Sequence, residues 1–122
     1  MHLAAELLRR RHRAAAQAGM KAIGLPLYAA EGCGSPAITA VAPEGIDAEA
    51  MRKAVKEKFD ILLAGGQDHL KGKVFRIGHL GFVCDRDVLT AVAAIEATLQ
   101  DLGLHKGGMG AGVAACAAAL AG

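Results

Sequence analysis

The 122-residue sequence is poor in aromatic side chains, and it carries almost no excess of charge. It has no Trp, one Tyr and three Phe, against 27 Ala and 16 Gly. Alanine buries little surface and aromatic rings bury most, so the core is thin for a hydrophobic content of 53%. A chain of this length still removes about two-thirds of its unfolded surface from water. We expect a single domain over residues 1–122 that folds without disulfide or metal and is partly stabilised by contact with a partner surface.

The sequence lacks the features that mark several classes of protein. The net charge of +2 is too small to indicate a nucleic-acid partner, and residues 107–122 lack the length and hydrophobicity of a membrane span. The basic cluster near the N-terminus follows leucines, the reverse of the order in a secretory signal. We therefore expect a cytoplasmic protein with no membrane or nucleic-acid partner. The three cysteines are far apart, which predicts buried or inert thiols: Cys33, Cys84 and Cys116. The five histidines have no metal-ligand spacing, so no metal site is predicted: His2, His12, His69, His79 and His105.

The first third of the chain predicts one helix and two short strands. Apolar residues recur at helical spacing over residues 3–18, and Gly19 is expected to close that helix. Within it, the arginines of residues 9–13 favour a solvated or partner-facing surface, with nucleic-acid binding as the alternative. Residues 25–29 and 37–41 are apolar stretches between Gly and Pro residues, which is typical of strands.

The middle of the chain predicts a helix that begins after Asp47. Asp47 is a favourable N-cap, and Glu49 lies in the positive first turn. One face of this helix is expected to be buried, and it carries Met51, Ala54, Val55 and Phe59. The opposite face is expected to be solvated, and it carries Arg52, Lys53, Lys56 and Lys58.

The remainder predicts two antiparallel strands, at residues 61–64 and 73–77, followed by two helices. Asp85 is expected to cap the first helix, and Gly103 to end it. Its buried stripe is Val88, Val92, Ile95, Leu99 and Leu102. The glycine-rich residues 107–112 are interpreted as a flexible linker to a short helix at 113–120. This order favours an α+β two-layer sandwich, with helices on one face of a small, mostly antiparallel sheet.

Arg76 is the one charged residue inside a predicted apolar strand, between Phe75 and Ile77. A guanidinium cannot lose its proton, so in a half-buried sheet it must meet an anion. One interpretation is an internal salt bridge to a carboxylate such as Asp47, Asp85 or Glu96. The other is a ligand carboxylate, which the planar fork of arginine binds through two hydrogen bonds. The residue alone leaves both open.

Three blocks of sequence resemble one family. Residues 70–81, LKGKVFRIGHLG, look like the C-terminal signature of class V aminotransferases of the alanine/serine–glyoxylate type, a branch of fold-type I pyridoxal-phosphate enzymes. Residues 35–41, SPAITAV, with 43–47, PEGID, are similar to the family's strand-turn-helix segment. Residues 11–25 resemble the helix before it, so the likeness spans nearly the whole chain.

The resemblance implies that Arg76 occupies the position of the arginine that holds the substrate carboxylate. It also implies that the chain corresponds to the C-terminal small domain, without the large domain that carries the cofactor lysine. None of the seven lysines lies in a context like the family's catalytic segment, so no catalytic or cofactor-binding residue is predicted in this chain. His79, two residues beyond Ile77, is interpreted as structural or as a neighbour of the site.

The leading hypothesis is the C-terminal domain of a pyridoxal-phosphate-dependent aminotransferase. The full-length enzyme would act on an amino acid and a 2-oxo acid such as glyoxylate, as a homodimer, while this chain alone would be inactive and bind no cofactor. The alternative is a non-enzymatic α+β binding or dimerisation module. In both cases the first helix and the Ala-rich last helix are expected to expose an apolar docking surface.

Overall fold

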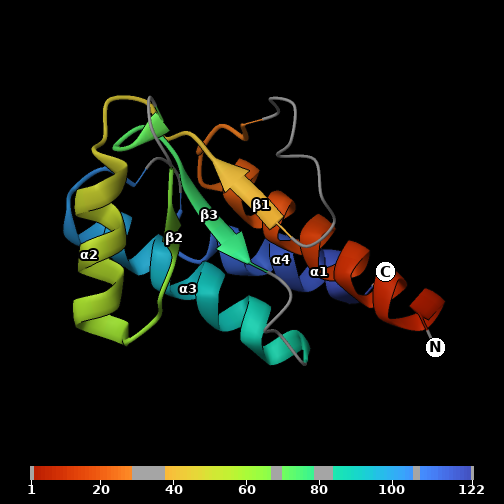
Figure 1. The fold of residues 1–122 in the computed structure, drawn as a ribbon. Helices are drawn as coiled ribbons and strands as arrows, with labels where there is room; N and C mark the ends of the chain where they lie inside the picture. Colours follow the sequence, from red (N-terminus) through yellow and green to blue (C-terminus); the bar gives the residue numbers. More distant parts are fainter. Residues whose placement is uncertain (1, 29–37, 67–69, 79–83, 106–107, 122) are drawn as a thin grey trace.

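The computed structural model describes residues 2–28, 38–66, 70–78, 84–105 and 108–121, and these form four helices and a three-stranded sheet (Figure 1). The elements in chain order are α1 (His2–Ala22), β1 (Ile38–Val41), α2 (Ala48–Phe59), β2 (Ala64–Gly65), β3 (Phe75–Gly78), α3 (Asp85–Asp101) and α4 (Ala111–Ala121). The strand order is β1-β3-β2, and both pairs are antiparallel. The predicted α+β fold with an antiparallel sheet is confirmed.

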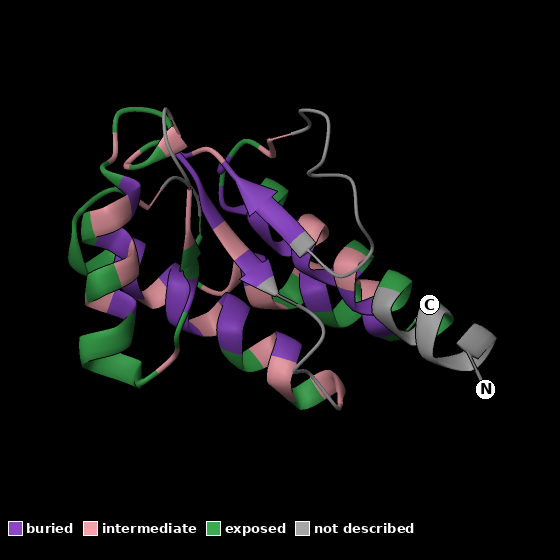
Figure 2. Ribbon diagram, in the orientation of Figure 1, coloured by how far each residue is buried: buried purple, intermediate pink, exposed green. Residues whose placement is uncertain are grey.

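One face of the sheet is packed on the helices. Val41 pairs with Phe75 across β1 and β3, as Thr39 does with Ile77, and all four residues are buried. Figure 1 shows α1, α3 and α4 behind the sheet and α2 beside β2, and Figure 2 shows the buried residues gathered where these layers meet. Because side chains alternate along a strand, Arg76 must point to the opposite face.

That opposite face carries Ala40, Ala64 and Arg76, and we call it the open face. Ala40 and Ala64 are the register partners of Arg76 on the two flanking strands. Ala40 is buried, Arg76 is half-buried and Ala64 is exposed, so this face is open on the side of β2. The central strand therefore places a guanidinium on the side of the sheet away from the helical layer.

Helix α1 is longer than predicted. Gly19 does not close it, because the helix continues to Ala22 and the left-handed glycine beyond its end is Gly24, with a φ of 79°. Gly19 lies instead at a close helix crossing. A Cβ there would be 2.8 Å from Val92 Cγ1 and 3.2 Å from the carbonyl oxygen of Gly112. Its small size serves packing between helices and not termination.

The two predicted helix caps have different outcomes. Asp47 is the N-cap of α2, since its Oδ1 accepts a hydrogen bond from the backbone N–H of Glu49 at 2.9 Å. The prediction that Asp85 caps α3 is wrong. Cys84 occupies that position without a side-chain cap bond, and Asp85 is the first helical residue. The carboxylate of Asp85 is instead directed to Arg11, which draws it away from the helix end.

The buried stripes end earlier than predicted. Val88, Val92, Ile95 and Leu99 of α3 are buried as expected. Leu102 is 47% exposed and Phe59 of α2 is 41% exposed, which corrects both predictions. Phe59 is the last residue of α2 and Leu102 is the C-cap that follows α3, and beside them Lys58 and Asp101 join the two helix ends by an ion pair of 2.5 Å. The apolar contact between the helices has already ended there.

The strands are shorter than predicted. The stretch at residues 25–29 contributes only an isolated bridge between Leu27 and Val41 in its described part, whereas the strand at 37–41 is confirmed as β1. The strand predicted at 61–64 overlaps β2 only at Ala64, because β2 consists of Ala64 and Gly65. The carbonyl of Leu63 accepts from Arg52 of α2 at 3.1 Å, so the chain before β2 is bonded to a helix and not to a strand.

The first and last helices pack along each other, and this covers much of the apolar surface predicted on them. A Cβ on Gly112 of α4 would lie 2.7 Å from Ile23 Cγ2, which shows how closely the two segments approach. The remaining exposed face of α4 consists of Ala114, Ala117, Ala118 and Ala121. The larger exposed apolar side chains lie mainly elsewhere: Leu7, Phe59, Leu62, Leu102, Leu104 and Met109.

Candidate functional site

Arg76 is half-buried, and its described side-chain hydrogen bond goes to one backbone group. Its Nε donates to the carbonyl oxygen of Gly65 on β2 at 3.1 Å. Among the residues that the structure describes, no carboxylate forms an ion pair with it. A guanidinium carries five N–H donors, and those on the two terminal nitrogens form the flat fork that matches a carboxylate. The geometry therefore suits a planar anion at the open face.

The three carboxylates proposed as internal partners of Arg76 are all engaged elsewhere. Asp47 caps α2, Asp85 lies 2.6 Å from Arg11 Nη1, and Glu96 is bound to His105. The internal salt bridge to any of these three is therefore wrong. The interpretation of Arg76 as a ligand-binding residue remains, and His79 lies outside the described residues.

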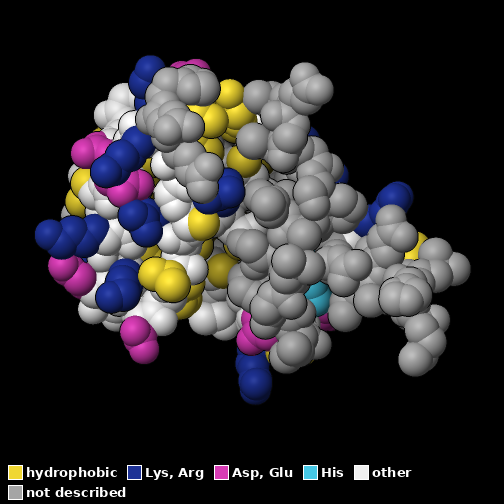
Figure 3. Space-filling view, in the orientation of Figure 1, with side chains coloured by type: hydrophobic (Ala, Val, Ile, Leu, Met, Phe, Trp, Pro, Cys, Tyr) yellow, Lys and Arg dark blue, Asp and Glu magenta, His cyan; other side chains and the backbone are white. Residues whose placement is uncertain are grey.

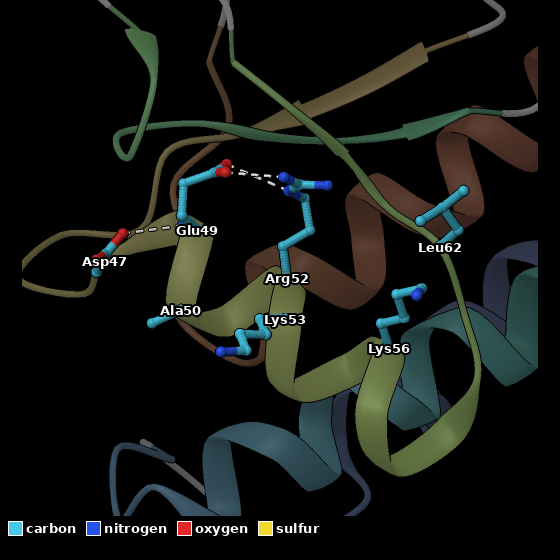
Figure 4. Close-up of a pocket in the computed structure, with 7 residues that line it drawn as sticks. All are labelled: Asp47, Glu49, Ala50, Arg52, Lys53, Lys56 and Leu62. Atoms are coloured by element: carbon cyan, nitrogen blue, oxygen red, sulfur yellow. Dashed lines mark hydrogen bonds and ion pairs between the residues drawn. The ribbon is translucent and has the colours of Figure 1, made fainter.

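An ion pair of α2 lies directly beneath β2, as Figure 4 shows. The Nη2 of Arg52 donates to Glu49 Oε1 at 2.7 Å, and its Nε donates to Oε2 at 3.2 Å. The hydrogen bond from Arg52 holds the pKa of Glu49 below its usual range, and the same bond raises the pKa of Arg52. The charge pattern of this helix predicted a solvated Arg52 and not this ion pair, although the spacing of three residues is the signal for it.

The same ion pair borders a cavity of about 380 Å³ between α2 and Leu62. Lys53 and Lys56 line its outer side and are exposed, as predicted. Figure 3 shows the lysine and arginine side chains gathered over α2 on this side of the molecule. The region is therefore basic at its rim, with a neutralised pair at its inner wall.

Glu96 of α3 forms a second charged site, and it is almost fully buried. Its Oε2 contacts His105 Nε2 at 2.6 Å and accepts from the backbone N–H of Gly110 at 3.0 Å and of Gly112 at 3.3 Å. Its Oε1 accepts from the N–H of Val113 at 3.3 Å. The carboxylate thus binds the unpaired N–H groups at the start of α4. We call this arrangement the Glu96 clamp.

The Glu96 clamp corrects the prediction for the glycine-rich segment. Burial raises the pKa of Glu96, but the hydrogen bonds from His105 and from the N–H groups of Gly112, Val113 and Gly110 together outweigh it, so the pKa lies below its usual range. The described part of residues 107–112 is therefore tied to α3 and is not a free linker. The sequence offered no signal for this, because the donors are backbone groups.

Asp85 joins the start of α3 to α1. Its Oδ1 lies 2.6 Å from Arg11 Nη1 and 3.2 Å from Nε2 of the buried His12, and Arg11 also donates to the carbonyl of Leu120. The hydrogen bond from Arg11 is the largest cause that lowers the pKa of Asp85. Arg11 thus acts within the fold, while Arg10 and Arg11 both stay exposed as predicted.

The described cysteines have no catalytic environment. Cys116 is fully buried, as predicted, and burial together with the charge of Asp85 raises the pKa of its thiol to about 11. It is therefore protonated and unreactive near neutral pH. Cys84 is half-buried, and Cys33 lies outside the described residues.

The lysines that the structure describes do not fit a Schiff-base site for pyridoxal phosphate. A lysine that forms a Schiff base needs an enclosed setting, whereas every described lysine is exposed: Lys21, Lys53, Lys56, Lys58, Lys71 and Lys73. Over the described ranges, no group of three or more His, Cys, Asp or Glu side chains is placed to hold a metal ion. None of the helices in those ranges is both long and apolar enough to cross a membrane.

Comparison with known proteins finds relatives that are much longer than this chain. The small subunit of a soluble hydrogenase from Synechococcus sp. (strain PCC 6716) is 63% identical over 106 residues, which is 87% of this chain and 28% of that protein. The (S)-ureidoglycine–glyoxylate transaminase of Bacillus subtilis (strain 168) is 40% identical over 111 residues, 89% of this chain and 26% of that protein. No family model matches the chain.

A solved structure has the same fold. The crystal structure of ureidoglycine-glyoxylate aminotransferase from Bacillus subtilis matches with a TM-score of 0.80 and 35% sequence identity, over 93% of this chain and 30% of that chain. In fold and sequence this chain resembles aminotransferases, of which it spans less than a third. Several of its relatives are named as glyoxylate aminotransferases, so the resemblance to class V aminotransferases of the serine/alanine–glyoxylate type, drawn from residues 70–81, is confirmed.

Proposed function

We propose that this chain is the C-terminal domain of a pyridoxal-phosphate-dependent aminotransferase in which Arg76 binds the substrate carboxylate. The full-length enzyme moves an amino group between an amino acid and a 2-oxo acid such as glyoxylate. The proposal is supported by relatives named as glyoxylate transaminases, of which this chain spans about a quarter. The observation that carries it is the position of Arg76 at the open face, with one carbonyl partner and no described carboxylate.

The role of Arg76 in this proposal is to bind and orient. Two parallel hydrogen bonds from the guanidinium fix a carboxylate in position and in rotation. Holding a substrate in the reactive geometry lowers the barrier by several kcal/mol. Arg76 is then a substrate anchor, and no acid, base or nucleophile is assigned to this chain.

The cofactor and the second subunit belong to the same proposal. Since no described lysine fits the cofactor, its site lies in a domain outside this chain, and this chain alone is inactive. The full-length enzyme is proposed to be a cytoplasmic homodimer. Pyridoxal phosphate added to the 122-residue chain should give no stoichiometric adduct that borohydride can trap, and such an adduct would contradict this part of the proposal.

The decisive experiment is Arg76→Lys in the full-length protein. We expect kcat/KM for the amino donor to fall about 100-fold, because a lysine cannot donate two parallel hydrogen bonds to a carboxylate. The absorbance of bound cofactor should be unchanged. The matched control is Arg86→Lys, since Arg86 is exposed on α3 and lies outside the sheet. Equal kinetics for the two variants would refute the assignment of Arg76.

A second candidate function is favoured by the 63% identical relative, whose name is that of a soluble hydrogenase subunit. In that case the domain is a non-enzymatic binding module. The chain has only three cysteines, far apart, so an iron–sulfur cluster with four cysteine ligands cannot form within it. Assays of the full-length protein for transamination and for hydrogen-dependent dye reduction separate the two. Dye reduction that survives Arg76→Lys, without any transamination, would favour the second candidate.

A further inference from the structure

The orientation of Arg76 depends on a very short strand. Its Nε is bonded to the carbonyl of Gly65, and Gly65 belongs to β2, which has only two residues. Beyond the register pairs of β2, the N–H of Gly66 donates to the carbonyl of Val74 at 3.0 Å. So short an edge strand has few ladder hydrogen bonds of its own to fix its position. Another contact must hold the carbonyl of Gly65 in place.

The Glu49–Arg52 pair of α2 supplies that contact. Arg52 Nη1 donates to the carbonyl of Leu63, two residues before Gly65, at 3.1 Å. An added Cβ on Gly65 would lie only 2.6 Å from Glu49 Oε2 and 3.2 Å from Arg52 Nε. In Figure 4 both side chains of the pair extend from α2 toward the strands above it. The pair therefore touches β2 both before Gly65 and at Gly65.

The pair is itself fixed at its base. The first turn of α2 is held by the cap bond from Glu49 N–H to Asp47 Oδ1 and by the bond from Ala48 N–H to the carbonyl of Gly72, at 3.0 Å. The side chains of Glu49 and Arg52 are about one-third exposed or less, at 27% and 32%. Their mutual bonds leave little freedom of rotation. A rigid turn of α2 thus supports the strand that holds Arg76.

We propose that Glu49 and Arg52 are positioning residues for Arg76. They hold β2 so that the carbonyl of Gly65 fixes Nε, and the fork of terminal nitrogens then faces outward to a substrate carboxylate. The expected effect of Glu49 and Arg52 on catalysis rests on the proposed function of Arg76. Their support of the Arg76 guanidinium does not depend on that function, and it can be measured in this chain alone.

The test adds one methyl group at Gly65. Gly65→Ala places a Cβ against Glu49, while Gly108→Ala is the matched control, because a Cβ at Gly108 meets nothing within 4 Å. The first readout is the exchange rate of the Arg76 Nε–H proton in this chain, measured by nuclear magnetic resonance and assigned by its loss in Arg76→Lys. We expect about tenfold faster exchange in Gly65→Ala, from loss of one hydrogen bond, and no change in Gly108→Ala.

The second readout is kinetic and uses the full-length protein. Gly65→Ala should raise KM for the amino donor about tenfold and change kcat less than about twofold, because a misdirected fork weakens substrate and transition-state binding alike. Arg52→Lys is the second variant, because lysine keeps the charge but cannot bond Glu49 and the Leu63 carbonyl together. It should shift both readouts in the same direction.

The outcomes separate this inference from the function it rests on. If Gly65→Ala and Arg52→Lys match the Gly108→Ala control in exchange and in KM, while Arg76→Lys lowers kcat/KM, the positioning role is wrong and the function of Arg76 stands. If Arg76→Lys leaves kcat/KM unchanged, the proposed function is wrong. In that case the exchange rates of the Arg76 Nε–H proton still test whether Glu49 and Arg52 position Arg76.

Discussion

Glu96 and Arg76 are both charged groups set among apolar neighbours, and the fold treats them differently. Glu96 is 1% exposed and has four hydrogen-bond partners within the chain, including His105. Arg76 is half-buried and has one described partner, the carbonyl of Gly65. A buried charge is tolerated only when its partners compensate for lost water. Glu96 therefore contributes to the stability of the fold, whereas Arg76 keeps hydrogen-bond donors that can bind an external anion.

The largest expected effect is the loss of stability in Glu96→Ala. Removing the carboxylate leaves His105 and the first N–H groups of α4 without their acceptor, which costs about 3 kcal/mol of unfolding free energy. Urea unfolding of this chain, followed by circular dichroism, measures it. Glu57→Ala is the control, since Glu57 is exposed on α2. Equal midpoints for the two variants would show that the clamp contributes nothing.

The next largest effect is a dependence of the unfolding free energy on pH in the acid range. The pKa of Glu96 is lower in the fold than the usual 4.5, so its contribution is complete above about pH 4.5 and is lost as pH falls through the folded pKa. Unfolding free energy should therefore decrease toward low pH, and Glu96→Gln should flatten that decrease. Asp85, whose pKa is also lowered, should leave a residual slope. Parallel curves for the wild type and Glu96→Gln would contradict the assignment.

The smallest effect belongs to Arg76→Met. Methionine keeps most of the aliphatic stem and loses one hydrogen bond, so the unfolding free energy should change by less than about 0.5 kcal/mol. The same urea measurement checks it. A loss as large as that in Glu96→Ala would erase the difference between the two charges and make Arg76 a structural residue.

Side-chain type and spacing predicted those parts of the fold that depend on residues close together in the sequence. The cap at Asp47, the buried positions of α3 up to Leu99 and the antiparallel pairing of β2 with β3 follow from side-chain type and spacing. Arg76 was found because an arginine inside an apolar strand is costly. Its place at the open face followed from the alternation of side chains between Phe75 and Ile77.

The predictions failed where a residue that fits a local sequence pattern instead contacts a segment distant in the sequence. Gly19 resembled a helix terminator, but its small size serves a contact with Val92 and α4. Asp85 resembled a cap, but Arg11 on another helix binds it. The glycine-rich segment resembled a linker, because the acceptor of its N–H groups, Glu96, lies 14 residues or more away in sequence from Gly110. Such contacts are tertiary, and no spacing in one sequence reports them.

The close crossing of α1 and α4 has a consequence for how the chain is made. Arg11 of α1 donates to the carbonyl of Leu120 of α4, 109 residues later, so contacts of long sequence separation join the two helices. Contacts of such long separation slow folding, because a large loop must close before they form. The surface of α1 that α4 covers is therefore buried only once α4 has been synthesised, and we expect these two helices to dock late in folding.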